Sequence, residues 1–211
     1  MTGRATRVAA LADAAVELLA EGGMRALTHR AVDARAGVPL GTTSAYLRTR
    51  QALIEAVVRR LAELDRADLA ARELPTGTAL GNQGRAAALG AADLDQLAAA
   101  VAQVLDRWLT TGRTRTLARY ACLLEAVHRP ELRPILDQGT VLRVQARDLL
   151  ARAGAPDPRR QGDQLVAFVD GLLFDRLVGA GTLSAPPPGT EESRADLRAA
   201  VRSLLRALTG A

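Results

Sequence analysis

The spacing of apolar residues constrains the fold of this chain more than any other feature of its sequence. Near the start of the chain, apolar residues recur every three or four positions, at Val8, Leu11, Ala12, Ala15, Leu18 and Leu19. This spacing places their side chains on one face of a helix, which Gly22 and Gly23 are suited to end. Similar spacing recurs in most later segments, and none has a convincing strand pattern. The sequence therefore predicts an all-α protein.

Nine helices are expected from this spacing together with capping residues and chain breaks. The second has Thr28 as its N-cap and runs to about Arg35, and Pro39 suits the first position of a third helix at residues 40–47. The other six are expected after Thr49 and at about residues 93–109, 114–127, 131–153, 159–178 and 190–208. Loops are predicted where glycine is frequent or where three prolines follow one another, at residues 75–90 and 179–189.

The composition fits a helical protein with a basic N-terminal end. Aromatic residues make up only 2% of the chain, so the core must consist of Leu, Val and Ala. The first 60 residues contain 9 Arg against 5 acidic residues, whereas the remaining residues contain 19 Arg against 18. A nucleic-acid-binding end requires such a positive excess, although an ordinary fluctuation of composition would also produce it.

Several classes of protein are disfavoured by what the sequence lacks. A single cysteine, Cys122, excludes an intramolecular disulfide and a cysteine-based metal site. No segment has the roughly 18 consecutive apolar residues of a membrane span, and the N-terminus lacks the pattern of a signal peptide. We find no HExxH motif and no phosphate-cradling glycine loop. We therefore expect a cytoplasmic protein with no metal site, no cofactor and no membrane contact.

Residues 27–53 carry the motif that indicates a function, and they read LTHRAVDARAGVPLGTTSAYLRTRQAL. Two short predicted helices flank a turn centred on Gly37, which is the layout of a helix-turn-helix. Glycine supplies the backbone freedom that such a turn needs. Val32, Val38 and Leu47 are the apolar residues that would lock the two helices together. The second helix of such a pair enters the major groove of DNA.

This pattern resembles the DNA-binding domain of TetR-family (tetracycline-repressor-like) transcriptional repressors over residues 4 to about 60. The matching residues are Gly22, Leu27, Thr28, Arg30, Ala36, Gly37, Val38, Gly41, Thr42, Tyr46, Arg50 and Leu53. The chain departs from the usual pattern at Pro39, Ser44 and Leu47. It also has Asp33 where a small apolar residue is common, so this carboxylate either faces solvent or needs a partner.

Ten residues are candidates for contact with double-stranded operator DNA: Thr28, Arg30, Pro39, Leu40, Gly41, Thr42, Thr43, Ser44, Tyr46 and Arg50. Thr28 at a helix N-terminus suits a phosphate, as do the side chains of Arg30, Tyr46 and Arg50. Gly41 allows close approach of the backbone to DNA. The three consecutive hydroxyl residues that follow Gly41 are candidates for contacts with base edges. No arginine precedes Arg48 in the recognition helix, so DNA shape is expected to carry part of the specificity.

The resemblance implies a DNA-binding domain at residues 1–48 and an effector-binding and dimerisation domain at residues 49–211. Helices between about residues 50 and 155 would enclose a small-molecule pocket. The candidate ligand contacts are Trp108, Tyr120, Glu125 and His128. For each of these residues, the alternative to ligand contact is that the side chain packs in the core or is exposed to solvent. The helices at about 159–178 and 191–209 would pair with those of a second copy in a homodimer, the alternative being burial within one copy.

Three functions are compatible with these observations. The first is a DNA-binding transcriptional repressor that a small-molecule ligand releases from its operator. The second is a DNA-binding protein controlled by a protein partner, without a small-molecule effector. The third is a small helical enzyme, which is disfavoured because no nucleophile–base pair or carboxylate dyad has a recognisable spacing. We therefore expect a regulator and not an enzyme.

Overall fold

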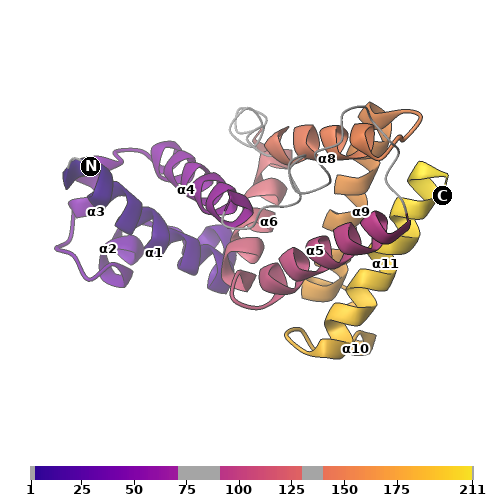
Figure 1. The fold of residues 1–211 in the computed structure, drawn as a ribbon. Helices are drawn as coiled ribbons and strands as arrows, with labels where there is room; N and C mark the ends of the chain where they lie inside the picture. Colours follow the sequence, from indigo (N-terminus) through magenta and orange to yellow (C-terminus); the bar gives the residue numbers. More distant parts are fainter. Residues whose placement is uncertain (1–2, 71–90, 130–139, 211) are drawn as a thin grey trace. The chain divides into compact units, whose positions relative to one another are not determined.

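The computed structural model describes residues 3–70, 91–129 and 140–210 of the chain. Every regular element within these ranges is a helix, so the prediction of an all-α fold is confirmed (Figure 1). None of the helices in these ranges is both long and apolar enough to cross a membrane. The predicted loop at residues 75–90 and the first part of the predicted helix at 131–153 lie outside the described residues.

The described helices form two compact units. The first contains α1 (Gly3–Ala26), α2 (His29–Arg35), α3 (Thr42–Tyr46), α4 (Arg50–Ala70) as far as Asp68, and α6 (Arg113–His128). The second contains α5 (Ala91–Leu109), α8 (Thr140–Arg152), α9 (Pro158–Val178), α10 (Gly181–Ser184) and α11 (Glu191–Thr209). These packing units do not test the predicted functional boundary between residues 48 and 49.

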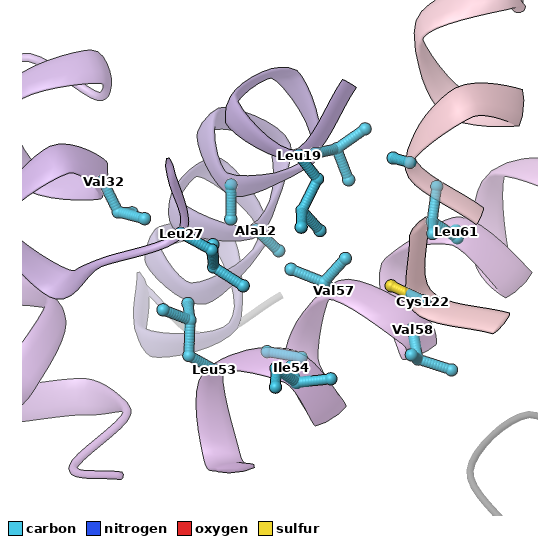
Figure 2. Close-up of a cluster of buried hydrophobic side chains, with 14 of the residues drawn as sticks. Ala12, Leu19, Leu27, Val32, Leu53, Ile54, Val57, Val58, Leu61 and Cys122 are labelled. Atoms are coloured by element: carbon cyan, nitrogen blue, oxygen red, sulfur yellow. The ribbon is translucent and has the colours of Figure 1, made fainter. Parts of the chain in front are cut away.

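The first unit is built around the apolar face of α1 that the sequence predicts. This helix packs against α2 and α6, and α4 adds its own apolar face to the same core. Figure 2 labels side chains that share this core: Ala12, Leu19, Leu27, Val32, Leu53, Ile54, Val57, Val58, Leu61 and Cys122. Leu, Val and Ala dominate the core, as the scarcity of aromatic residues requires.

The glycine pair interrupts α1 where the sequence predicts that the helix ends. Gly23 has a φ of 62° and a ψ of −161°, a conformation that is not helical and that L side chains rarely adopt. The regular helix that begins at Gly3 is therefore broken at Gly23, and a short helical segment to Ala26 follows this kink.

The second unit contains the two C-terminal helices that the sequence predicts. α9 packs against α5, α8 and α10, while α11 packs against α5. Asp157 caps α9 by accepting a hydrogen bond from the Arg160 N–H, and Thr190 caps α11 through the Ser193 N–H. α10 is a short helix within residues 179–189, which the sequence predicted to be a loop.

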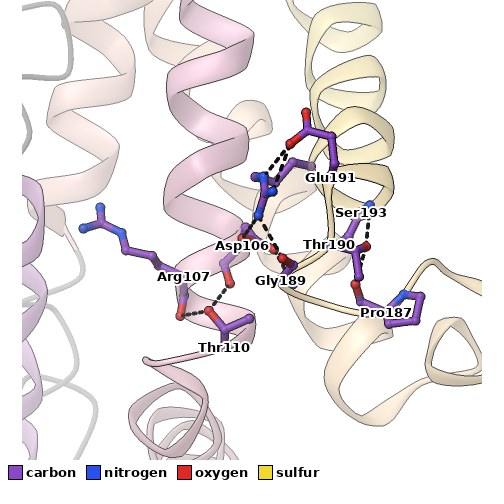
Figure 3. A network of polar contacts seen from close by, with 9 residues as sticks. Asp106, Arg107, Thr110, Pro187, Gly189, Thr190, Glu191 and Ser193 are labelled. Carbon is purple, nitrogen blue, oxygen red and sulfur yellow. Dashed lines mark hydrogen bonds and ion pairs between the residues drawn. The ribbon is translucent and has the colours of Figure 1, made fainter.

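A polar network joins the end of α5 to the start of α11 within this unit (Figure 3). The carboxylate of Asp106 is buried, and its Oδ1 accepts a hydrogen bond of 2.8 Å from the Gly189 N–H. Its Oδ2 accepts a hydrogen bond of 3.3 Å from Nη1 of Arg194, which also donates to the Gly189 carbonyl. Asp106 thereby fixes the segment that leads from the three prolines into α11.

Candidate nucleic-acid interface and ligand cavity

The helix-turn-helix predicted from residues 27–53 is present as α2, a turn and α3. Thr28 caps α2, because its hydroxyl oxygen accepts a hydrogen bond of 3.1 Å from the Ala31 N–H. Gly37 in the turn has a φ of 64°, the left-handed conformation for which glycine was expected. Val32 and Leu47 are buried in the core of the first unit, where they hold α2 and α3 together.

The start of α3 corrects a prediction. The helix begins at Thr42, and Pro39 is not its first residue. The Pro39 carbonyl instead accepts hydrogen bonds from the backbone N–H and the hydroxyl of Thr42, in a turn that precedes the helix. Gly41 lies in this turn with a φ of 89°, so the backbone conformation alone accounts for a glycine at this position.

A buried carboxylate holds the N-terminal end of α3 in place. Asp33 on α2 is only 1% exposed, and its Oδ2 accepts a hydrogen bond of 2.7 Å from the Gly41 N–H. Its Oδ1 accepts bonds of 2.7 Å and 2.6 Å from the N–H and the hydroxyl of Thr43. Burial raises the pKa of Asp33, but these hydrogen bonds and the charge of His29 outweigh it and hold the pKa below its usual value. The question of whether Asp33 faces solvent or has a partner is thus settled in favour of a partner.

The structure brings most of the candidate DNA contacts to the surface of α2, the turn and α3. The exposed candidates are Thr28, Arg30, Pro39, Leu40, Gly41 and Ser44, while Thr42 and Tyr46 are half-buried. Leu40 is 71% exposed, so its side chain is accessible on this surface. Ala45 and Arg48 are exposed beside them, although the sequence did not single them out as contacts.

Two candidate DNA contacts instead donate hydrogen bonds to other groups of the protein. Thr43 is fully buried and its hydroxyl donates to Asp33, so it is not available to a base in this structure. Arg50 is half-buried, and its guanidinium donates hydrogen bonds of 2.5 Å to the carbonyls of Leu27 and Met24. Arg50 therefore ties the start of α4 to the junction of α1 and α2, and we leave both residues out of the proposed contacts.

The arginines of the first unit divide into paired and unpaired groups. Arg35 forms ion pairs with Glu17 and Glu21, and Arg60 forms one with Asp13. Arg30 on α2 takes part in no ion pair within the described residues. Carboxylates already hold Arg35 and Arg60, so Arg30 is the better candidate for a contact with a phosphate.

The second unit contains a cavity of about 110 Å³ between α5, α8 and α9. Ten of its twelve lining residues are apolar, and Gln145 and Asp170 are the two polar ones. Trp108, one of the four candidate ligand contacts, is among these lining residues. It is also the only tryptophan of the chain.

The other three candidate ligand contacts lie on α6, in the first unit, and do not line this cavity. Tyr120 is buried, Glu125 forms an ion pair with Arg129, and His128 is exposed. The described residues contain no group of three His, Cys, Asp or Glu side chains placed to hold a metal ion.

Comparisons with known proteins agree on one family. Residues 11–57 match the family model of bacterial regulatory proteins of the tetR family, and residues 92–207 match that of the tetracyclin repressor-like C-terminal domain. No curated protein matches the chain.

Three solved structures illustrate the similarity. A TetR-family member from Streptomyces coelicolor A3 is 29% identical, with a TM-score of 0.64, over 94% of this chain and 98% of that one. The multidrug binding protein EbrR in complex with imidazole is 27% identical, with a TM-score of 0.61, over 94% of both chains. A transcriptional regulator from Rhodococcus sp. Rha1, 22% identical over 94% of both chains, shares the fold with a TM-score of 0.70.

Proposed function

This chain belongs to the TetR family of bacterial regulatory proteins, and on that premise we propose that it is a transcriptional repressor that a small molecule releases from operator DNA. The observation that carries the proposal is the exposed surface of α2, the turn and α3, which offers Arg30, Leu40 and Ser44 to solvent. The separate apolar cavity supports the regulatory part of the proposal.

In the proposed complex, α2 contacts phosphates and α3 lies in the major groove. Thr28 and Arg30 contact the DNA backbone at the N-terminal end of α2. Leu40 and Ser44 face base edges, with Leu40 suited to a thymine methyl and Ser44 to a hydrogen bond. This assignment leaves no bidentate arginine contact to guanine from α3 itself, so DNA shape contributes to operator choice.

The effector is proposed to bind in the cavity between α5, α8 and α9. An apolar protein cavity of about 150 Å³ holds a single benzene ring, so a space of about 110 Å³ suits a small, largely apolar molecule. Gln145 and Asp170 would orient a polar group of this molecule. EbrR has been solved with imidazole, proflavin, ethidium and malachite green. Imidazole is small enough for this space and is the first probe for this chain, whereas the three larger dyes test whether the space can widen.

A second copy of the chain is proposed to pack on α9 and α11. Four small or apolar residues follow one another at helical spacing along the exposed face of α9, at Ala167, Gly171, Phe174 and Val178. Phe174 is 43% exposed and Val178 is 53% exposed. Solvent-exposed apolar residues in a row on one helix face favour a helix–helix interface, and a dimer would present two recognition helices to two half-sites.

The effector proposal can be tested with the full-length protein and its single tryptophan. The four probe compounds are titrated against the protein while the fluorescence of Trp108 is recorded, and binding to a DNA duplex that the protein selected from a random pool is then measured with and without the probe. A probe that changes Trp108 fluorescence is expected to weaken DNA binding. A probe that clearly binds in the cavity yet leaves DNA affinity unchanged would favour control by a protein partner.

A pair of matched variants shows whether the cavity itself is the binding place. Ala146 lines the cavity from α8, so Ala146→Leu should fill part of the space and weaken probe binding. Ala151 lies on the same helix but is exposed, so Ala151→Leu should bind the probe as the original protein does. Equal loss in both variants would mean that the probe binds elsewhere.

A further inference from the structure

We propose that Asp33 is a positioning residue for DNA recognition, which fixes the orientation of α3 and thereby determines the side chains that meet the bases. This inference rests on the proposed DNA binding. It concerns a residue that touches no DNA itself and acts through Gly41 and Thr43.

The argument begins with the length of α3. It spans only Thr42–Tyr46, and a helix of five residues has no stability of its own in water. The backbone bonds from the Ala45 N–H to Gly41 and from the Leu47 N–H to Thr43 complete no more than about one turn. Tertiary contacts must therefore fix the direction of its axis and its rotation about that axis.

Two side chains of α2 supply these contacts, one at each end of α3. Asp33 accepts hydrogen bonds from Gly41 and Thr43 at the N-terminal end. Nε2 of His29 donates a bond of 2.6 Å to the Leu47 carbonyl at the C-terminal end. His29 and Asp33 are four residues apart, so they lie on the same face of α2. We call this pair of side chains the α2 clamp.

The Asp33 end of the clamp determines which residues of α3 face outward. Its Oδ1 binds both polar groups of Thr43, which turns that residue into the core. Ser44, the next residue, is consequently exposed, as is Leu40 in the preceding turn. Hydrogen bonds are directional whereas apolar packing is not, so the carboxylate defines the rotation of α3 more closely than the buried leucines and valines do.

An apolar residue at position 33 would not perform this function. The N–H groups of Gly41 and Thr43 would lose their acceptor, and the Thr43 hydroxyl would be buried without a partner. Asparagine is the most informative replacement for Asp33. It has nearly the same shape, but one carboxylate oxygen becomes an NH₂ group, which cannot accept the bond from Gly41 or Thr43.

The test compares Asp33→Asn, Thr43→Val and Thr43→Ser with the original full-length protein. The probes are a duplex selected by the original protein from a random pool and a scrambled duplex at the same salt concentration. Asp33→Asn is expected to keep its helical circular dichroism and to bind the scrambled duplex within about twofold, because phosphate contacts dominate non-specific binding. Its preference for the selected duplex should fall at least about tenfold, the order of a lost base contact.

The threonine variants keep the inference testable if Asp33→Asn fails to fold. Thr43→Val retains the backbone bonds to Asp33 but loses the hydroxyl, so its preference should fall, whereas Thr43→Ser should retain the original preference. An undiminished preference in a folded Asp33→Asn or Thr43→Val protein would overturn the inference. Equal weakening on both duplexes would also overturn it, because it indicates a merely structural role. If the original protein selects no sequence at all, the proposed function fails first and the inference with it.

Discussion

Replacement of Arg50 by alanine separates the structural role of this residue from the phosphate contact that the sequence predicts. The guanidinium donates to two backbone carbonyls, those of Leu27 and Met24. A hydrogen bond from a charged donor contributes about 1.5–3 kcal/mol, and partial exposure of Arg50 places each bond near the lower end of this range. We therefore expect Arg50→Ala to lower the free energy of unfolding by about 2–4 kcal/mol. At about 2–4 °C per kcal/mol for a chain of this size, Tm should fall by roughly 4–16 °C.

The assay combines thermal unfolding with DNA binding over a series of salt concentrations. Arg30→Ala is the matched control, because Arg30 is exposed and has no ion pair within the described residues. The free energy of unfolding of Arg30→Ala should change by no more than about 0.5 kcal/mol. The slope of log K for DNA binding against log salt concentration should fall by the amount that corresponds to about one phosphate contact. Arg50→Ala should instead lower the free energy of unfolding and leave the salt dependence of DNA binding unchanged. An Arg50→Ala protein of unchanged stability and reduced salt dependence would refute the structural reasoning and support the phosphate contact.

Three further predictions follow from buried groups. Asp106→Ala should lower the free energy of unfolding by about 1–3 kcal/mol in urea denaturation, because Gly189 and Arg194 lose their acceptor; a change under about 0.5 kcal/mol would contradict this role. Cys122 should stay unreactive toward thiol reagents at neutral pH until the protein unfolds, because burial raises the pKa of its thiol to about 12; rapid labelling of the folded protein would contradict it. The folded pKa of Asp33 lies below its unfolded value, so the ionised carboxylate stabilises the fold above about pH 4. The difference in unfolding free energy between the original protein and Asp33→Asn should therefore shrink on acidification below that pH. A difference that grows on acidification would contradict the lowered pKa of Asp33.

The sequence predicts the helices well where the information is local. Apolar spacing identified the buried face of α1, and Thr28 and Thr190 were expected at the helix starts where they now act as N-caps. The exceptions depend on distant residues or on very short segments. The start of α3 is set by Asp33, eight residues before Gly41, and a four-residue helix such as α10 has too few positions to show a period.

The candidate site illustrates the same limit at the level of single side chains. Thr42, Thr43 and Ser44 are three hydroxyl residues in a row, and successive helix positions point about 100° apart, so they cannot all face DNA. Without the start of α3 and the partner of Asp33, the sequence could not tell which of them turns inward. The cavity was equally hidden, because apolar spacing does not show which helices of the second unit face one another; among the candidates, Trp108 alone lines it.

The contacts around α3 assign stability and specificity to different kinds of interaction. Leu27, Val32 and Leu47 hold the helix-turn-helix to the core by apolar packing, which tolerates changes of shape and has no preferred rotation. The α2 clamp adds little buried area, but its bonds are directional and act on both ends of a helix too short to hold its own orientation. Substitutions in the apolar core should therefore reduce stability first, whereas substitutions in the clamp should reduce the choice between DNA sequences first. Operator preference can then change in this chain through a residue such as Asp33, without any change in the side chains that meet the DNA.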